Sequence, residues 1–155
     1  MTISEAQSFA RNKTLKATGL LLAIVTSFFL LRETRGDLAN GILFFMEALV
    51  NFHTLIILTI LFGLTYFFSG MAGNEIIILK RNVFLVPLKY AILISFAVSA
   101  YTMFVGLFMA SEFTYDGFKK AFTTYFWEMF PKTFITLLVG WIWATHKMKS
   151  TIDQS

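Results

Sequence analysis

The sequence predicts an all-α integral membrane protein in which four transmembrane helices form a compact bundle, with the N and C termini cytoplasmic. The first observation is composition. Of the 155 residues, 57% are hydrophobic and 14% are charged, whereas a soluble domain is nearer half apolar and about a quarter charged. The second is distribution, because the apolar residues gather into four blocks. The polar segments between them are short, so we expect one membrane domain over residues 1–155.

The first expected span covers residues 16–32. It follows a basic segment and is not followed by a small-residue cleavage site, so a signal peptide is not favoured. Lys16 and Arg32 can extend their charged ends to the two membrane interfaces. Gly19 and Ala23 are candidate helix-packing residues, because small residues at four-residue spacing let a second helix approach closely.

The second expected span covers residues 43–69. One helix of this length exceeds a hydrocarbon core of about 30 Å, which places Glu47 near the outer boundary. At about 100° per residue, several polar residues fall on one face of this helix. Such a stripe should face protein or water, because ionisable groups are costly in lipid. The candidate polar stripe consists of Glu47, Asn51, Thr54, Thr65 and Ser69.

The third expected span covers residues 84–110 and follows a basic turn. Lys80 and Arg81 lie in this turn, and Lys89 lies about one turn into the helix. These three cations are candidates for contact with lipid headgroups or with a cytoplasmic partner. Small and hydroxylated residues recur along the span and form a second set of candidate packing residues. They are Ser95, Ser99, Thr102 and Gly106.

An amphipathic, aromatic-rich segment is expected at the outer interface before the fourth span. Thr114 or Asp116 can cap this helix at its N terminus. Pro131 disfavours helix at the residue before it, so we expect a break or kink there. The fourth span is expected over residues 130–147. Basic residues are more numerous on the side that carries both termini, as the positive-inside rule requires of the cytoplasmic side.

The sequence offers no catalytic, cofactor or metal site. It contains no cysteine, which excludes disulfides and thiolate chemistry. His53 and His146 lie far apart, and no phosphate-binding or dinucleotide motif is present. We therefore expect a protein that is not an enzyme and that does not bind nucleic acid directly.

The function expected from these features is that of a non-catalytic subunit in the plasma membrane, the inner membrane of a bacterium. Such a subunit would self-associate into a homo-oligomer in the lipid bilayer and anchor or signal to soluble or membrane partner proteins. The alternative is a small oligomeric channel or transporter subunit with a polar path lined by Glu47. The stripe headed by Glu47 is either that path or a seam between helices, and the sequence favours the seam.

In size and topology, the chain is similar to the small subunits of tripartite transporters. It is also similar in these respects to the four-span subunit of the Kiwa type of phage-defence complex. The spacing of Arg32 and Glu47 adds to the first resemblance. Either resemblance implies a membrane complex used in transport or defence, and neither assigns a site residue.

Overall fold

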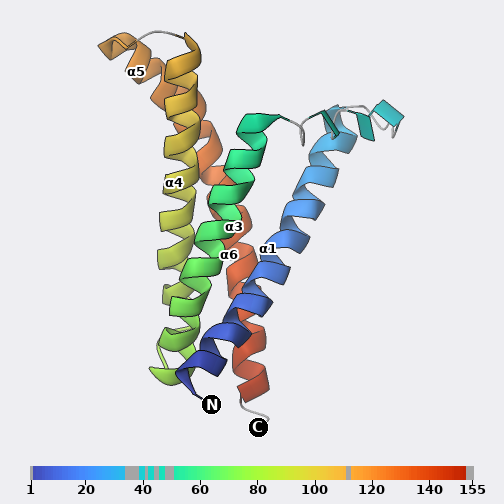
Figure 1. The fold of residues 1–155 in the computed structure, drawn as a ribbon, viewed down its shortest axis with the longest axis vertical. Coiled ribbons are helices and arrows are strands. Elements are labelled where there is room, and N and C mark those ends of the chain that lie inside the picture. The colour runs from blue at the N-terminus through green and yellow to red at the C-terminus, as the bar shows by residue number, and fades with distance from the viewer. Residues whose placement is uncertain are drawn as a thin grey trace.

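A computed structural model describes residues 2–33, 39–40, 42–43, 46–47, 51–110 and 113–152. The fold is all-helical, and no strand occurs in these ranges. Four long helices form the bundle in Figure 1, and shorter helical turns join or extend them. In chain order the elements are α1 (Ile3–Glu33), α3 (Phe52–Gly73), η1 (Asn74–Ile78), α4 (Leu85–Ala110), α5 (Tyr115–Ala121), η2 (Phe122–Phe126) and α6 (Trp127–Ile152).

The start of α1, the end of α6 and the turn between η1 and α4 lie at the same end of the bundle (Figure 1). The opposite end carries α5. α1 lies against both α3 and α6. The described beginning and end of the chain therefore lie at the same end of the bundle.

Two helical stretches of the described chain are long and apolar enough to span a membrane. They are Phe52–Ile78 and Leu85–Met109. Only 28% of the apolar window in the first stretch and 39% of that in the second are buried inside the bundle. Much of the apolar surface of both helices therefore faces outward. A core helix of a soluble protein, in contrast, would be mostly buried.

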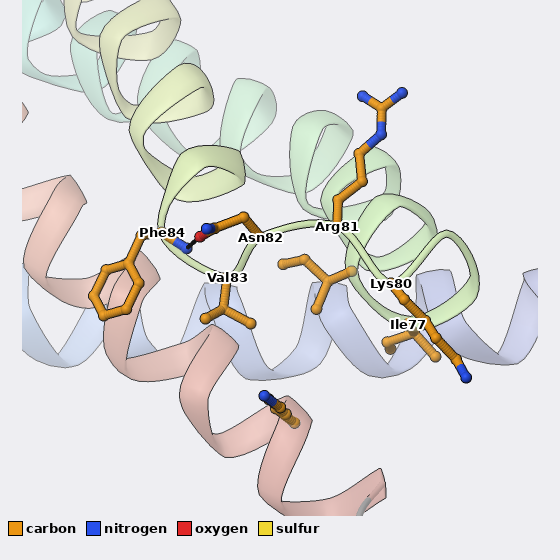
Figure 2. A pocket seen from close by; sticks show the side chains of 8 residues that line it. Ile77, Lys80, Arg81, Asn82, Val83 and Phe84 are labelled. Carbon is orange, nitrogen blue, oxygen red and sulfur yellow. Dashed lines mark hydrogen bonds between the residues drawn. The ribbon is translucent and has the colours of Figure 1, made fainter.

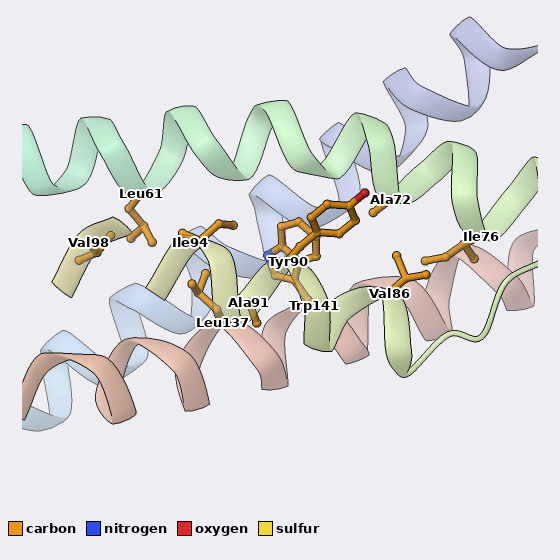
Figure 3. Close-up of a cluster of buried hydrophobic side chains, with 10 residues drawn as sticks. All are labelled: Leu61, Ala72, Ile76, Val86, Tyr90, Ala91, Ile94, Val98, Leu137 and Trp141. Atoms are coloured by element: carbon orange, nitrogen blue, oxygen red, sulfur yellow. The ribbon is translucent and has the colours of Figure 1, made fainter. Parts of the chain in front are cut away.

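The central core joins α3, α4 and α6 around two aromatic side chains (Figure 3). Tyr90 of α4 and Trp141 of α6 are 1% and 0% exposed, and their ring centres are 5.7 Å apart. Phe68 of α3 stacks on Tyr90, and the centres of the two rings are 5.1 Å apart. These contacts between aromatic rings stabilise the packing beyond the area they bury.

α1 docks onto the bundle through small residues. A methyl group added to Gly73 of α3 would lie 2.8 Å from the carbonyl oxygen of Ala6 in α1. A methyl group on Gly140 of α6 would lie 2.8 Å from a terminal carbon of Leu21. Ala10 of α1 is also fully buried. The backbones of α1 and its neighbours can therefore approach more closely than larger residues would allow.

A ladder of stacked phenylalanines connects η2 to α6. Phe122, Phe126, Phe130 and Phe134 follow one another at four-residue spacing, with ring centres 4.9, 5.7 and 5.9 Å apart. Thr114 caps α5 by accepting a hydrogen bond from the backbone N–H of Gly117 at 3.1 Å, which confirms one of the two predicted caps.

The expectation of one continuous helix over 43–69 is wrong, because α3 begins at Phe52. Asn51 has extended backbone angles (φ −66°, ψ 122°), and its side chain accepts a hydrogen bond from the backbone N–H of His53. Asparagine is a strong N-cap. Its hydrogen bond sets the start of the helix at Phe52, although apolar residues continue on both sides of Asn51. The helix also extends past Ser69 to Gly73, where η1 follows.

Of the break or kink expected at Pro131, the break is wrong, and a kink stays a prediction. Pro131 lies inside α6, and α5, η2 and α6 follow one another without a gap. A proline inside a helix leaves one carbonyl without its usual donor and crowds the preceding turn. The widened π-helical turn of η2 lies just before this point. Such π turns commonly accommodate local irregularity in a helix.

Candidate functional site: the basic end of the α3–α4 hairpin

The hairpin between α3 and α4 turns at the end of the bundle that holds both chain ends. η1 closes the α3 side, and the backbone N–H of Arg81 bonds the carbonyl of Glu75 at 2.9 Å. Lys80 has φ 49°, a left-handed conformation that costs a non-glycine residue about 1 kcal/mol. Asn82 then accepts from the backbone N–H of Phe84 at 2.8 Å and so caps the start of α4. These bonds fix the backbone of the turn.

Glu75 is the centre of the polar contacts in this hairpin. Its Oε1 lies 3.0 Å from Nζ of Lys89, and its Oε2 lies 3.3 Å from a guanidinium nitrogen of Arg81. The hydroxyl of Tyr90 donates to Oε1 at 2.5 Å. The Glu75 side chain is only 13% exposed. A carboxylate with little exposure needs such partners, because burial without them is costly.

The predicted cluster of Lys80, Arg81 and Lys89 is therefore divided between two environments. Arg81 and Lys89 pair with Glu75, and the Lys89 ammonium also lies 4.6 Å from the centre of the Tyr90 ring. Lys80 lines a hollow beside the turn, as Arg81 also does. Arg81 and Lys89 stabilise the hairpin through Glu75, whereas Lys80 has no acidic partner among the described residues.

The hollow has a volume of about 570 Å³ (Figure 2). Its basic residues come from the turn and from the last part of α6, where Lys149 joins Lys80 and Arg81. In Figure 2 the side chain of Arg81 points to the opposite side of the turn from Val83. The other lining residues are Ile76, Ile77, Asn82, Val83 and Phe84.

The predicted polar stripe on the second span exists only in part. Thr65 and Ser69 are fully buried in α3, and Ser69 donates to the carbonyl of Tyr66 at 3.0 Å. Thr54 is half-buried. Asn51 is the helix cap, and Glu47 is exposed and precedes the cap, so it does not belong to α3. The helical geometry that linked Glu47 to Thr65 is therefore wrong.

The two sets of candidate packing residues have different surroundings. Ser95, Ser99 and Gly106 are buried, and Thr102 donates to the carbonyl of Ser99 at 2.9 Å. The ring of Tyr125 occupies the space that a side chain at Gly106 would need.

Gly19 and Ala23, by contrast, do not pack against the rest of the described chain. No atom lies within 4 Å of the position that a methyl group on Gly19 would take, and Ala23 is exposed.

Two further polar contacts lie toward the other end of the bundle. Lys132 donates to Glu128 at 2.6 Å along α6. Nδ1 of His53 lies 3.2 Å from the hydroxyl of Tyr101, which connects α3 to α4. In the part of the chain that the structure describes, no three histidine or acidic side chains come together as metal ligands.

Sequence reasoning missed three residues of this site: Glu75, Tyr90 and Lys149. The signal for Glu75 was an acid just before the basic turn, at a position where a chain reversal can return Lys89 to it. Lys149 could not be placed from the sequence, because its proximity to the turn depends on how α6 packs.

The chain matches no protein-family model, and neither a curated protein nor a solved structure is significantly similar to it.

Proposed function

We propose that this chain is a non-catalytic, multi-pass membrane subunit that associates with copies of itself and anchors or signals to partner proteins. All four long helices span the membrane in this proposal, and both termini are cytoplasmic. The observation that supports the membrane location is that every long helix exposes large apolar side chains on the outer surface of the bundle.

α1 and α6 expose large apolar side chains on the outside of the bundle, as α3 and α4 do. Leu20, Ile24 and Phe28 of α1 are between 54% and 66% exposed. Ile135 and Val139 of α6 are 59% and 52% exposed. A soluble protein rarely exposes apolar patches of this extent, and lipid is the surrounding that accepts them. These side chains support spans at α1 and α6, where hydropathy and length alone do not.

Self-association is supported by the Gly19–Ala23 face of α1. No other part of the described chain covers this face, and its small residues are of the type that brings helices together in lipid. A partner role is supported by the connections between the helices, which are too short to fold as a separate catalytic unit.

The test is purification of the full chain in mild detergent, with its mass measured by light scattering. We expect an oligomer that co-purifies with a stoichiometric partner protein. Gly19→Leu should shift the oligomer toward the monomer, because leucine prevents close approach. Gly63→Leu is the matched control, since Gly63 is also open and lies on α3. A monomer without a partner in the unchanged protein would refute the proposal.

The same preparation tests the transport alternative. In that alternative, Glu47→Gln abolishes ion or solute flux into liposomes that contain the protein. Under the proposed function, the substitution leaves any flux unchanged, because Glu47 is exposed and lies outside the helix that carries Thr65 and Ser69.

A further inference from the structure

We propose that the hollow beside the α3–α4 turn binds the phosphate of an anionic phospholipid between Lys80 and Lys149. This inference rests on the membrane location in the proposed function, but not on self-association or on a partner protein.

The first argument is charge. Three cationic residues line the hollow, and none of its described lining residues is acidic. Lys80 and Lys149 form no ion pair with any described residue, whereas Arg81 is paired with Glu75. Basic pockets between helices at the cytoplasmic membrane surface attract anionic headgroups. Lys80 and Lys149 are therefore the residues placed to hold a phosphate.

The second argument is the apolar part of the same hollow. Ile76, Ile77 and Val83 line it beside the two lysines, and Phe84 adds an aromatic side chain that is 61% exposed. The neighbouring Leu85 is 63% exposed at the start of α4. A lipid offers phosphate to the lysines and acyl chains to these apolar groups. An acidic protein segment would match the charge and leave the apolar groups in water.

The third argument is the rigidity of the turn. Lys80 has φ 49°, and the bonds from Arg81 to Glu75 and from Phe84 to Asn82 fix the backbone on both sides of it. Lys80 therefore sits on a turn that is already ordered before a ligand arrives. A preorganised site loses less conformational freedom on binding than a flexible one.

The experiment compares lipid retention by the full chain and two variants. Vesicles of phosphatidylglycerol and phosphatidylcholine exchange lipid with the purified protein, and native mass spectrometry measures the bound phosphatidylglycerol. The test variant combines Lys80→Gly with Lys149→Gln; glycine suits the backbone at position 80. The control combines Lys119→Gln with Lys120→Gln, which removes the same charge from exposed positions in α5 at the other end of the bundle.

The test variant should bind phosphatidylglycerol about tenfold or more weakly, while the control stays close to the unchanged protein. Equal binding by the test variant would overturn the proposal. Displacement of phosphatidylglycerol by inorganic phosphate at a concentration equal to that of the lipid would also overturn the proposal, because the site would then recognise free phosphate. A test variant that keeps its lipid and loses an acidic co-purifying protein would show a protein-docking surface instead.

Extraction by alkaline carbonate separates this inference from the proposed function. If carbonate releases the unchanged protein from membranes, the proposed membrane function fails. If the protein stays in the membrane and binds phosphatidylglycerol no better than phosphatidylcholine, only the lipid inference fails.

Discussion

At the scale of single residues, Glu75 has the most polar contacts at the basic end of the bundle. It accepts from Tyr90 and pairs with both Arg81 and Lys89. Glu75 itself lies in η1, Arg81 lies in the turn, and Lys89 and Tyr90 lie in the first part of α4, so one carboxylate joins three consecutive parts of the hairpin. Its loss should loosen the turn more than the loss of either cation.

Glu75→Gln should lower the free energy of unfolding by about 1–2 kcal/mol, the range for a hydrogen-bonded group with a charged partner. Glutamine still accepts from the Tyr90 hydroxyl but has no charge for Arg81 and Lys89. Unfolding by denaturant in detergent micelles measures the change.

Glu128→Gln is the matched control for that substitution. Glu128 is exposed, and among the described residues it pairs with Lys132 of its own helix alone. Such surface pairs contribute little to stability, so this variant should unfold like the unchanged protein. Equal effects of the two substitutions would show that Glu75 is no more important than a surface acid.

The lysine at position 80 shows how a residue can be predicted while its surroundings are not. The sequence-based prediction placed Lys80, Arg81 and Lys89 in one group because all three are cationic. The chain reversal brings the last two to Glu75 and leaves Lys80 on the hollow with Lys149. Contacts between residues that are distant in sequence decided this division, so local patterns could not reveal it.

At the scale of elements, helix boundaries were predicted well where one sequence feature marks them. They were predicted poorly where two features favour different boundaries. The expected span at 84–110 agrees closely with α4 (Leu85–Ala110), because a polar turn ends sharply at a long apolar run. The start of α3 was misplaced, since apolar residues lie on both sides of the Asn51 cap. The tendency of Pro131 to end a helix was overestimated, because a widened turn can precede a proline inside a helix.

The crossing of α1 and α3 offers a direct test of helix packing. Gly73→Ala should destabilise the protein by about 1–3 kcal/mol, the usual effect of overpacking. The added methyl group would meet Ala10 and the backbone of Ala6, so the helices must separate. Thermal unfolding in detergent measures this effect.

Gly63→Ala is the control on the same helix. No atom lies within 4 Å of the position of its added methyl group, and alanine favours helix over glycine by up to about 1 kcal/mol. This variant should be as stable as the unchanged protein or more stable. A similar loss in both variants would mean that α1 does not cross α3 as closely as described.

At the scale of the whole molecule, the bundle has a compact centre and an apolar outside. Tyr90, Trp141 and their neighbours fill the centre, while large side chains such as Phe96 and Phe104 of α4 are 58% and 53% exposed. In water this distribution would promote aggregation. In lipid it is the expected one, because the surroundings are as apolar as the side chains.

The central claim is that four helices cross the membrane with both termini on one side. The chain has no cysteine, so single introduced cysteines can be labelled without removing native ones. Lys149→Cys lies near the end of α6, and Lys120→Cys lies in α5 at the opposite end (Figure 1). In intact cells, a membrane-impermeant maleimide should label Lys120→Cys and leave Lys149→Cys unlabelled until the membrane is opened. Labelling of both positions, or of neither, in intact cells would contradict the four-span bundle.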